Sequence, residues 1–215
     1  MGNKVSTEGI QLAALEKPVA CIDPKFCAQQ MVTLVLKEKG FSFSGDDFSI
    51  KDPYTDQTYF KVNGKMISLR GKKTFLDVAK EPVFNIQKKL ISWRMKQNVF
   101  KGDGDKEKAT VICERFTWFK PKLTAKFTDI NSGERCMLVC KANLMARKCV
   151  LYLDRGCKGK ENYVIVGDIG SPIMNMANLI MDKQTYYLRI APGMDMALMT
   201  AMVVAFDEKC HDKNK

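Results

Sequence analysis

The sequence predicts a mainly β protein, a closed antiparallel barrel of about twelve strands around a buried C-terminal α-helix. Two observations lead to this fold class. A near-continuous apolar run, MDMALMTAMVVAF, spans residues 194–206, and its Ala, Met and Leu residues favour helix. The sequence before it reads as short strands separated by turn signals. A helix that is apolar on every side must be buried, and a sheet that surrounds it closes most simply into a barrel.

The apolar run is too short for a membrane span. About 13 residues at 1.5 Å each cover some 20 Å, against a hydrocarbon layer of about 30 Å. The run also contains Asp195 and is followed by Asp207, Glu208 and Lys209. A core helix is therefore favoured over a tail anchor. The side chains expected inside the barrel are Met196, Leu198, Met199, Met202, Val203 and Phe206.

The strands are expected from residue 31 onward. Residues 1–30 contain Pro18 and Pro24 and show no sustained period, so they are predicted to be irregular. Asp52-Pro53 and the tract GDGDKEK at 102–108 are turn signals. Residues 174–182 are compatible with a short helix or a strand. The predicted strands cover 32–37, 47–51, 59–62, 65–71, 74–79, 83–88, 89–93, 98–101, 109–116, 122–129, 135–141, 149–153, 163–168 and 184–190.

The chain is expected to form one domain. Its 215 residues contain no Pro, Gly or Ser-rich linker, and 46% of them are apolar, which is ample for a core. We predict an N-terminal segment at 1–30, the barrel domain at 31–209 and a charged tail at 210–215. The N-terminus lacks the apolar core of a signal peptide, so a cytoplasmic location is expected.

The eight cysteines are expected to be reduced and metal-free. Cys136 and Cys140 lie four residues apart on a predicted strand, which places their side chains about 13 Å apart along one face. Zinc knuckles use two-residue gaps instead. Cys113 and Cys149 are likewise expected to be reduced and metal-free.

Positive charge is concentrated in the middle of the chain. The net charge is +11, and residues 61–130 hold 17 Lys or Arg against 7 Asp or Glu. Such an excess favours an anionic partner, either a membrane or a nucleic acid. A solvated barrel exterior whose charges serve only solubility is the alternative.

The N-terminus, MGNKVS, matches the N-myristoylation pattern, with Gly2 as the acylated residue and Ser6 at its required position. A single myristoyl chain binds membranes only marginally, at about 10⁴ M⁻¹. Each basic residue near an anionic leaflet adds about 1 kcal/mol. Acylation and the basic segment would therefore complement one another.

No catalytic constellation is evident. The single histidine is His211, in the charged tail, and adjacent Cys210 would point away from it. Gly102 to Asp105 form neither a phosphate-binding loop nor a calcium loop. We predict that the protein is not an enzyme and has no cofactor.

Several segments resemble the LURP-one-related family. They are DPKFCA at 23–28, the pair DFSIKD and YFKV, and KLISWRMKQNVFKG at 89–102. The last shared element is Pro192 to Ala197, followed by Met202-Val203-Val204. The chain departs from the family pattern at Gln97, where a Trp is typical, and in an extra loop around 155–162. The resemblance implies a Tubby-like barrel, related to phospholipid scramblases, and an association with plant defence.

These observations lead to the hypothesis of a monomeric, membrane-associated adaptor or sensor that binds acidic phospholipid and a protein partner. Gly2 would carry the acyl chain. The residues expected to bind lipid are Lys88, Lys89, Arg94, Lys96 and Lys101. A membrane-tethered nucleic-acid-binding regulator is one alternative, weakly supported because few aromatics interleave with the lysines. A scramblase-like lipid-handling protein is another, although the Pro-rich N-terminus and acylated Cys cluster of scramblases are absent.

Overall fold

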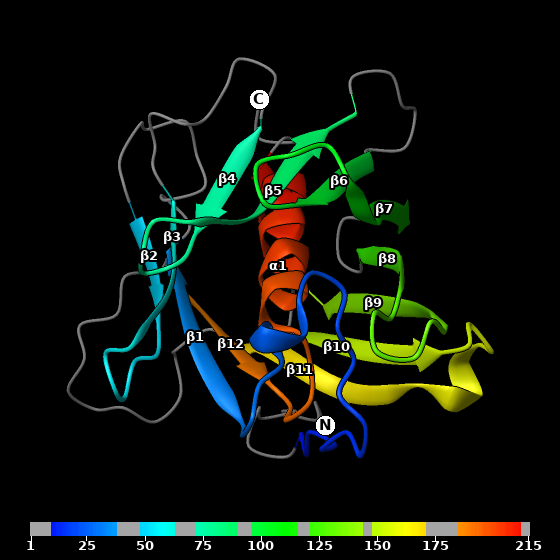
Figure 1. Ribbon diagram of the computed structural model, residues 1–215. Coiled ribbons are helices and arrows are strands. Elements are labelled where there is room, and N and C mark those ends of the chain that lie inside the picture. Colours follow the sequence, from blue (N-terminus) through cyan, green and yellow to red (C-terminus); the bar gives the residue numbers. More distant parts are fainter. Residues whose placement is uncertain are drawn as a thin grey trace.

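Twelve antiparallel strands form a closed barrel around one helix in the computed structural model (Figure 1). The structure describes residues 10–37, 48–62, 72–89, 96–115, 121–143, 148–170 and 185–211. Each strand pairs with its neighbours in sequence, and pairing of the first strand with the last closes the barrel. The predicted fold class is confirmed. The elements are η2 (Pro24–Phe26), β1 (Val32–Lys37), β2 (Phe48–Lys51), β3 (Thr58–Val62), β4 (Lys73–Leu76), β5 (Pro82–Lys88), β6 (Lys96–Lys101), β7 (Glu107–Arg115), β8 (Lys122–Thr128), β9 (Arg135–Asn143), β10 (Lys148–Arg155), η5 (Lys160–Asn162), β11 (Val164–Gly170), β12 (Thr185–Ile190) and α1 (Met196–His211).

The helix α1 runs through the barrel interior. Its 16 residues span about 24 Å at 1.5 Å per residue. All six helix residues expected in the core are buried, the most exposed of them by 7%. The helix begins two residues later than predicted and extends to His211 instead of ending at Phe206. The residues predicted as a frayed tail at 210–211 are therefore helical.

The strands contribute alternate side chains to the same core, as period-2 geometry requires. Phe75 on β4 stacks on Phe84 on β5 with ring centroids 4.3 Å apart. Phe60 on β3 meets Phe84 edge to face at 5.7 Å. These three rings are fully buried, and such aromatic pairs add to the free energy of burial.

Four of the five described turns between strands at one end of the barrel contain the same kind of hydrogen bond. In each of the turns that follow β2, β4, β8 and β10, an Asp carboxylate accepts backbone N–H groups from residues a few positions later. Such Asx contacts satisfy turn N–H groups that have no ladder partner. The acceptors are Asp52, Asp77, Asp129 and Asp154.

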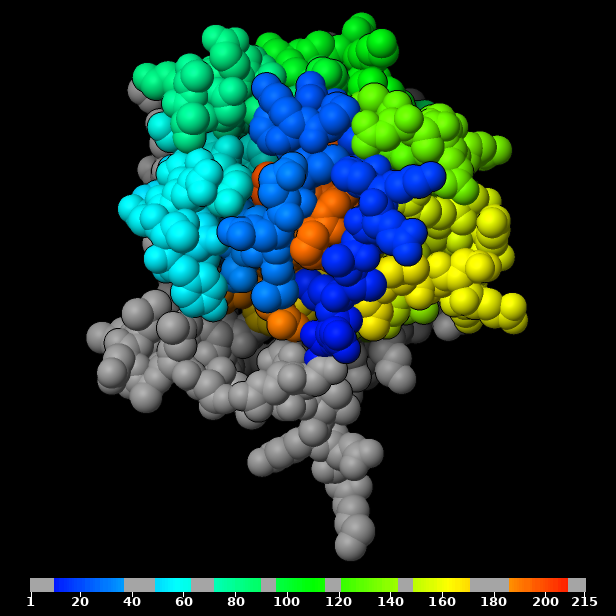
Figure 2. Space-filling model, turned by 60° about the horizontal axis from the view of Figure 1, so that its bottom comes forward, coloured from blue at the N-terminus to red at the C-terminus, as the bar shows by residue number. Residues whose placement is uncertain are grey.

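The irregular N-terminal segment belongs to the folded body. Figure 2 shows these residues, in blue, lying across one end of the barrel over the orange start of the helix. Val19 to Ile22 are at most 1% exposed. Isolated bridges join Val19 to Met194 and Cys27 to Asp195. The segment therefore covers the barrel mouth at which α1 begins.

Most predicted strands are present with shifted ends. β4 ends at Leu76 instead of 79, and β6 begins at Lys96 instead of 98. The strand predicted at 65–71 and the undecided segment 174–182 lie outside the described residues, as does most of the strand predicted at 89–93.

Candidate functional site

The two ends of the barrel differ in what they present. One end, here called the turn end, carries the described turns at 52–57, 77–81, 102–106, 129–134 and 156–163, together with the start of α1. At the other end, here called the helix-exit end, α1 finishes. Odd-numbered strands finish and even-numbered strands begin at the helix-exit end, because neighbouring strands are antiparallel. β5 therefore finishes there at Lys88, and β6 begins there at Lys96.

Three of the five predicted lipid-binding residues lie together at the helix-exit end. Lys88 pairs with Gln97 across β5 and β6. The N–H of Lys89 donates to the carbonyl oxygen of Lys96 at 2.9 Å. Lys89 is exposed and Lys96 is half-buried. Within the described ranges, neither ammonium group forms an ion pair. Of the three predicted lysines at this end, these two are the ones without a carboxylate partner among the described residues.

Lys101 lies apart from the other lysines. It ends β6 opposite Phe84, about 13 Å along the strand from Gln97 at 3.3 Å per residue. Its ammonium group lies 2.8 Å from a carboxylate oxygen of Asp23 in the N-terminal segment. Burial raises the pKa of Asp23, but the hydrogen bond from Lys101 and further contacts outweigh this and lower it. The ion pair of Lys101 with Asp23 thus holds the N-terminal segment over the turn end of the barrel. Arg94 and Gly2 lie outside the described residues.

Lys88 belongs to a buried polar cluster that the sequence analysis did not predict. The carboxylate of Glu208 on α1 is 2.5 Å from the ammonium nitrogen of Lys73 and 3.4 Å from that of Lys88. The side-chain amide of Gln97 donates to the same carboxylate at 2.8 Å. Lys73 and Glu208 are only 3% and 8% exposed. Lys88 therefore has a structural role, and of the predicted lipid-binding residues described at this end, Lys89 and Lys96 are the cations available to a partner.

No local signal in the sequence marks this cluster. Lys73 lies between Lys72 and Thr74 at the start of a short strand, and Glu208 follows the apolar helix run. Only the pairing of β4 with β5 and β5 with β6 brings Lys73, Lys88 and Gln97 to one barrel wall. Gln97 is thus one of the groups that hold the end of α1.

The buried thiols are poorly suited to nucleophilic chemistry. Burial raises the pKa of Cys21 well above its usual value, that of Cys27 to about 12 and that of Cys136 to about 11. The thiolate is the reactive and metal-binding form, so these groups stay protonated at neutral pH. Their expected role as core thiols stays a prediction.

Two further thiols, on the neighbouring strands β9 and β10, are in contact with each other. The sulfur atoms of Cys140 on β9 and Cys149 on β10 are 2.9 Å apart, and both are free cysteines. Cys140 stands opposite Leu151, two residues along β10 from Cys149. In the described part of the chain, no group of three or more His, Cys, Asp or Glu residues is arranged to hold a metal ion.

The described ranges also contain no helix that combines the length and the apolar character required to cross a membrane. The side chain of His211, the single histidine, lies outside the described residues.

Comparison with known proteins finds relatives of this chain in Arabidopsis thaliana. Protein LURP-one-related 15 of Arabidopsis thaliana is 24% identical over 190 residues, covering 87% of this chain and 84% of the relative. Protein LURP1 of the same species is 22% identical, covering 90% of this chain and 91% of the relative. An X-ray structure of an Arabidopsis thaliana protein shares the fold, with a TM-score of 0.58, 21% identity, and coverage of 91% of this chain and 99% of that one.

The family assignment rests on a match along most of the chain. The family model described as LURP-one-related matches residues 32–207, which run from the first residue of β1 to Asp207 near the end of α1. The matched region therefore contains every strand of the barrel and most of its central helix. The chain belongs to the LURP-one-related family.

Proposed function

We propose that this protein is a non-enzymatic, membrane-associated adaptor or sensor that binds acidic phospholipid through the helix-exit end of its barrel. One observation carries the proposal. Lys89 and Lys96 stand side by side at this end, without a carboxylate partner among the described residues, in a chain of net charge +11. Lysines near an anionic leaflet contribute about 1 kcal/mol each at low salt.

A second signal supports membrane attachment. The MGNKVS start provides Gly2 for acylation, and one acyl chain alone binds only marginally. Two lysines would add about 2 kcal/mol, roughly a thirtyfold gain in affinity. Acylation and the lysine pair together are therefore sufficient for stable attachment in the cytoplasm.

An adaptor also needs a protein partner, and the family resemblance suggests a pathway in plant defence.

Co-sedimentation with lipid vesicles tests the electrostatic part of this proposal. The full chain, without its acyl group, is mixed with vesicles of phosphatidylcholine alone or with added phosphatidylserine. We expect binding only to the acidic vesicles, and weaker binding in 0.5 M salt because of screening. The double variant Lys89→Gln/Lys96→Gln should lose up to about 2 kcal/mol of binding free energy.

A matched control removes the same charge from the turn end. Lys80 and Lys106 are exposed in turns there, so Lys80→Gln/Lys106→Gln should bind acidic vesicles almost as the wild type does. Equal losses in the two double variants would show that only total charge matters and would contradict a lipid site at the helix-exit end. A single-stranded oligonucleotide that bound more tightly than the acidic vesicles would favour the nucleic-acid alternative instead.

A further inference from the structure

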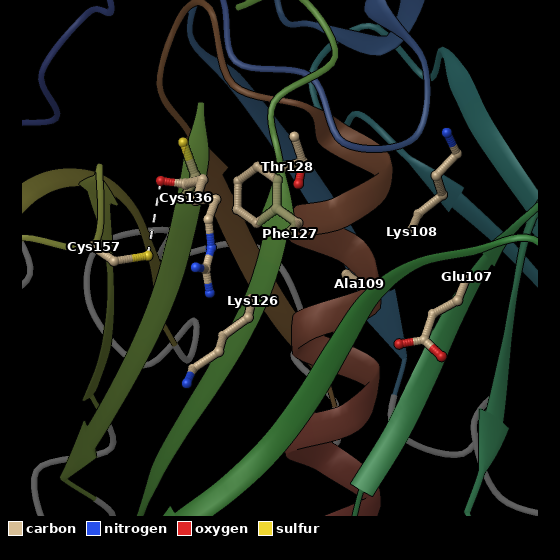
Figure 3. A pocket seen from close by; sticks show the side chains of 9 residues that line it. Glu107, Lys108, Ala109, Lys126, Phe127, Thr128, Cys136 and Cys157 are labelled. Carbon is tan, nitrogen blue, oxygen red and sulfur yellow. Dashed lines mark hydrogen bonds between the residues drawn. The ribbon is translucent and has the colours of Figure 1, made fainter. Parts of the chain in front are cut away.

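A second basic site lies at the turn end, away from Lys89 and Lys96. A surface pocket of about 310 Å³ opens where β7, β8 and β9 approach their turns. Its walls include the basic residues Lys108, Lys126 and Arg135, the hydroxyl of Thr128 and the thiol of Cys157. In Figure 3, Lys108 lies on one side of Phe127, and Lys126 and Cys157 lie on the other. The volume is at the lower end of the range for small-molecule sites.

Strand register brings Lys126 and Arg135 to one face of the sheet. Thr128 on β8 stands opposite Arg135 on β9. Lys126 precedes Thr128 by two residues and therefore shares its face. Lys126 and Arg135 are thus diagonal neighbours, whose side chains start about 7–8 Å apart, a spacing that lets both contact one small anion. Lys108 lies at an irregularity of β7, between Glu107 and Ala109, and lines the pocket from the other side of Phe127 (Figure 3).

The pocket has a surplus of positive charge. Over the described part of the chain, none of its three basic side chains forms an ion pair. The carboxylate of Glu107 also lines the pocket, where it accepts hydrogen bonds from the Asn98 amide at 2.7 Å and from the Thr110 hydroxyl. Three basic residues against this one acidic residue leave the lining with an excess of two positive charges. A cationic pocket with an unoccupied arginine fork fits a tetrahedral oxyanion, which arginine binds through two parallel hydrogen bonds.

The N-terminal segment also holds the walls of the pocket in place. The Cys21 thiol donates to the carbonyl oxygen of Lys108 at 3.6 Å, and the N–H of Ile130 donates to the carbonyl oxygen of Ala20 at 2.8 Å. The N-terminal segment thus fixes β7 and the end of β8 relative to each other. A site whose walls are already fixed loses less entropy when it binds a ligand.

We propose that this pocket binds a phosphate-bearing anion, with Arg135 as the bidentate ligand, Lys126 as the flanking cation and the Thr128 hydroxyl as a further donor. Lys108 adds positive charge from the other side of the pocket. The chemistry recognised is a phosphate group that carries two negative charges. The source is a free phosphorylated metabolite or a lipid headgroup with a terminal phosphate. The site is separate from the proposed acidic-lipid surface, and either one can fail without the other.

Protection of Cys157 reports binding at this pocket. Its side chain is exposed, whereas Cys21, Cys27, Cys136, Cys140 and Cys149 are buried. The full chain is treated with iodoacetamide in the presence of pyrophosphate or of chloride at equal ionic strength, and labelling of each cysteine is followed by peptide mass analysis. Pyrophosphate should slow labelling of Cys157 at least threefold and leave Cys113 unaffected. Equal labelling in pyrophosphate and chloride would overturn the proposal.

Calorimetric titration with pyrophosphate measures the affinity. Arg135→Gln and Lys126→Gln should each weaken binding about tenfold, because each removes a charged ligand. Arg135→Lys keeps the charge but loses the fork, so its affinity should also fall. Lys89→Gln/Lys96→Gln removes charge from the other end and should bind pyrophosphate as the wild type does. Wild-type affinity in Arg135→Gln would refute the site, provided that its near-UV circular dichroism shows a folded protein.

Vesicles that contain phosphatidic acid distinguish the two sources. If the ligand is a lipid headgroup, the wild type binds these vesicles, and Arg135→Gln abolishes the increment over phosphatidylserine vesicles of the same charge. If the ligand is soluble, pyrophosphate binding depends on Arg135 while vesicle binding does not. Either pattern supports a phosphate pocket. Binding of phosphate-bearing ligands that is insensitive to Arg135, Lys126 and Lys108 contradicts it.

Discussion

At the residue scale, the carboxylate of Asp195 joins two parts of the protein at one point. It accepts N–H groups of Ala197 and Leu198 in the first turn of α1, at 2.9 and 3.2 Å, and so acts as the helix N-cap. It also accepts the N–H groups of Cys21 and Ile22 in the N-terminal segment, at 2.9 and 2.7 Å. Burial raises the pKa of this fully enclosed carboxyl, although the four hydrogen bonds lower it.

Replacing Asp195 by Ala should therefore be strongly destabilising. Loss of the cap costs about 1 kcal/mol, and each buried N–H left without a partner costs about 1–3 kcal/mol. We expect a loss of at least 3 kcal/mol in urea unfolding. Asp77→Ala is the control, because Asp77 accepts two N–H groups in a turn that is largely exposed. Equal losses for the two variants would mean that Asp195 does not join the helix to the N-terminal segment.

Asp129 predicts a pH dependence of stability. Burial raises its pKa, but hydrogen bonds from the Ser132 hydroxyl and from the N–H groups of Ala20 and Asn131 lower it below the ordinary value of 3.8. The unfolded chain then binds the proton more readily, so the stabilisation is present above pH 3.8 and is lost as pH falls through the folded pKa.

The difference in unfolding free energy between wild type and Asp129→Asn should be about 1–2 kcal/mol at pH 7. It should shrink as pH falls below 4. The comparison isolates this one carboxyl from the other acids of the barrel. A difference that stayed constant from pH 7 to pH 3 would refute the role assigned to ionised Asp129.

At the element scale, the apolar helix and most strands could be predicted because local pattern determines them. The residue at which α1 ends could not be predicted in the same way. The helix continues to His211 with Glu208 buried because Lys73, Lys88 and Gln97 neutralise and bind that carboxylate. Those partners lie more than 100 residues earlier in the chain, and no periodicity encodes their distance. For the same reason, the sequence places Lys101 in one predicted lipid-binding group with Lys88, although the two residues lie at opposite ends of the barrel.

The packing of α1 against β11 depends on Gly167. A Cβ atom there would lie 2.4 Å from the terminal carbon of Met199 on α1 and 2.8 Å from the carbonyl oxygen of Arg189 on β12. The methionine can move, but the backbone oxygen cannot. Gly167→Ala should therefore cost about 2 kcal/mol through overpacking, measured by urea unfolding.

Gly104→Ala is the matched control for this position. Its added Cβ would meet only a backbone oxygen at 3.8 Å, which is ordinary van der Waals contact. We expect a change within about 0.5 kcal/mol. A Gly167→Ala protein as stable as Gly104→Ala would show that the helix is not pressed against this wall of the barrel.

At the scale of the whole molecule, the candidate lipid site could be predicted only in part. The sequence located a basic middle segment, but its net charge does not reveal which cations face outward together. The structure joins Lys88, Lys89 and Lys96, commits Lys88 to Glu208 and Lys101 to Asp23, and leaves Lys89 with Lys96 at one end. The phosphate pocket had no sequence signal, because Lys126 and Arg135 meet only through the register of β8 and β9.

The proposed attachment uses two signals that should act independently. Gly2→Ala removes the acylation site without any change in the barrel, and Lys89→Gln/Lys96→Gln removes the lysine pair. Since each signal alone gives marginal binding, loss of either one should shift part of the protein from membranes to the soluble fraction. Free energies of independent sites add, so loss of both should release almost all of it.

The most direct measurement is membrane fractionation of cells that express four full-length proteins: the wild type, Gly2→Ala, Lys89→Gln/Lys96→Gln and the combination. We predict a membrane-bound wild type, intermediate partition for the two partial variants, and an almost entirely soluble combined variant. A combined variant that remains with the membranes as the wild type does would contradict the proposal that this barrel is held at acidic membranes by an acyl chain and a lysine pair.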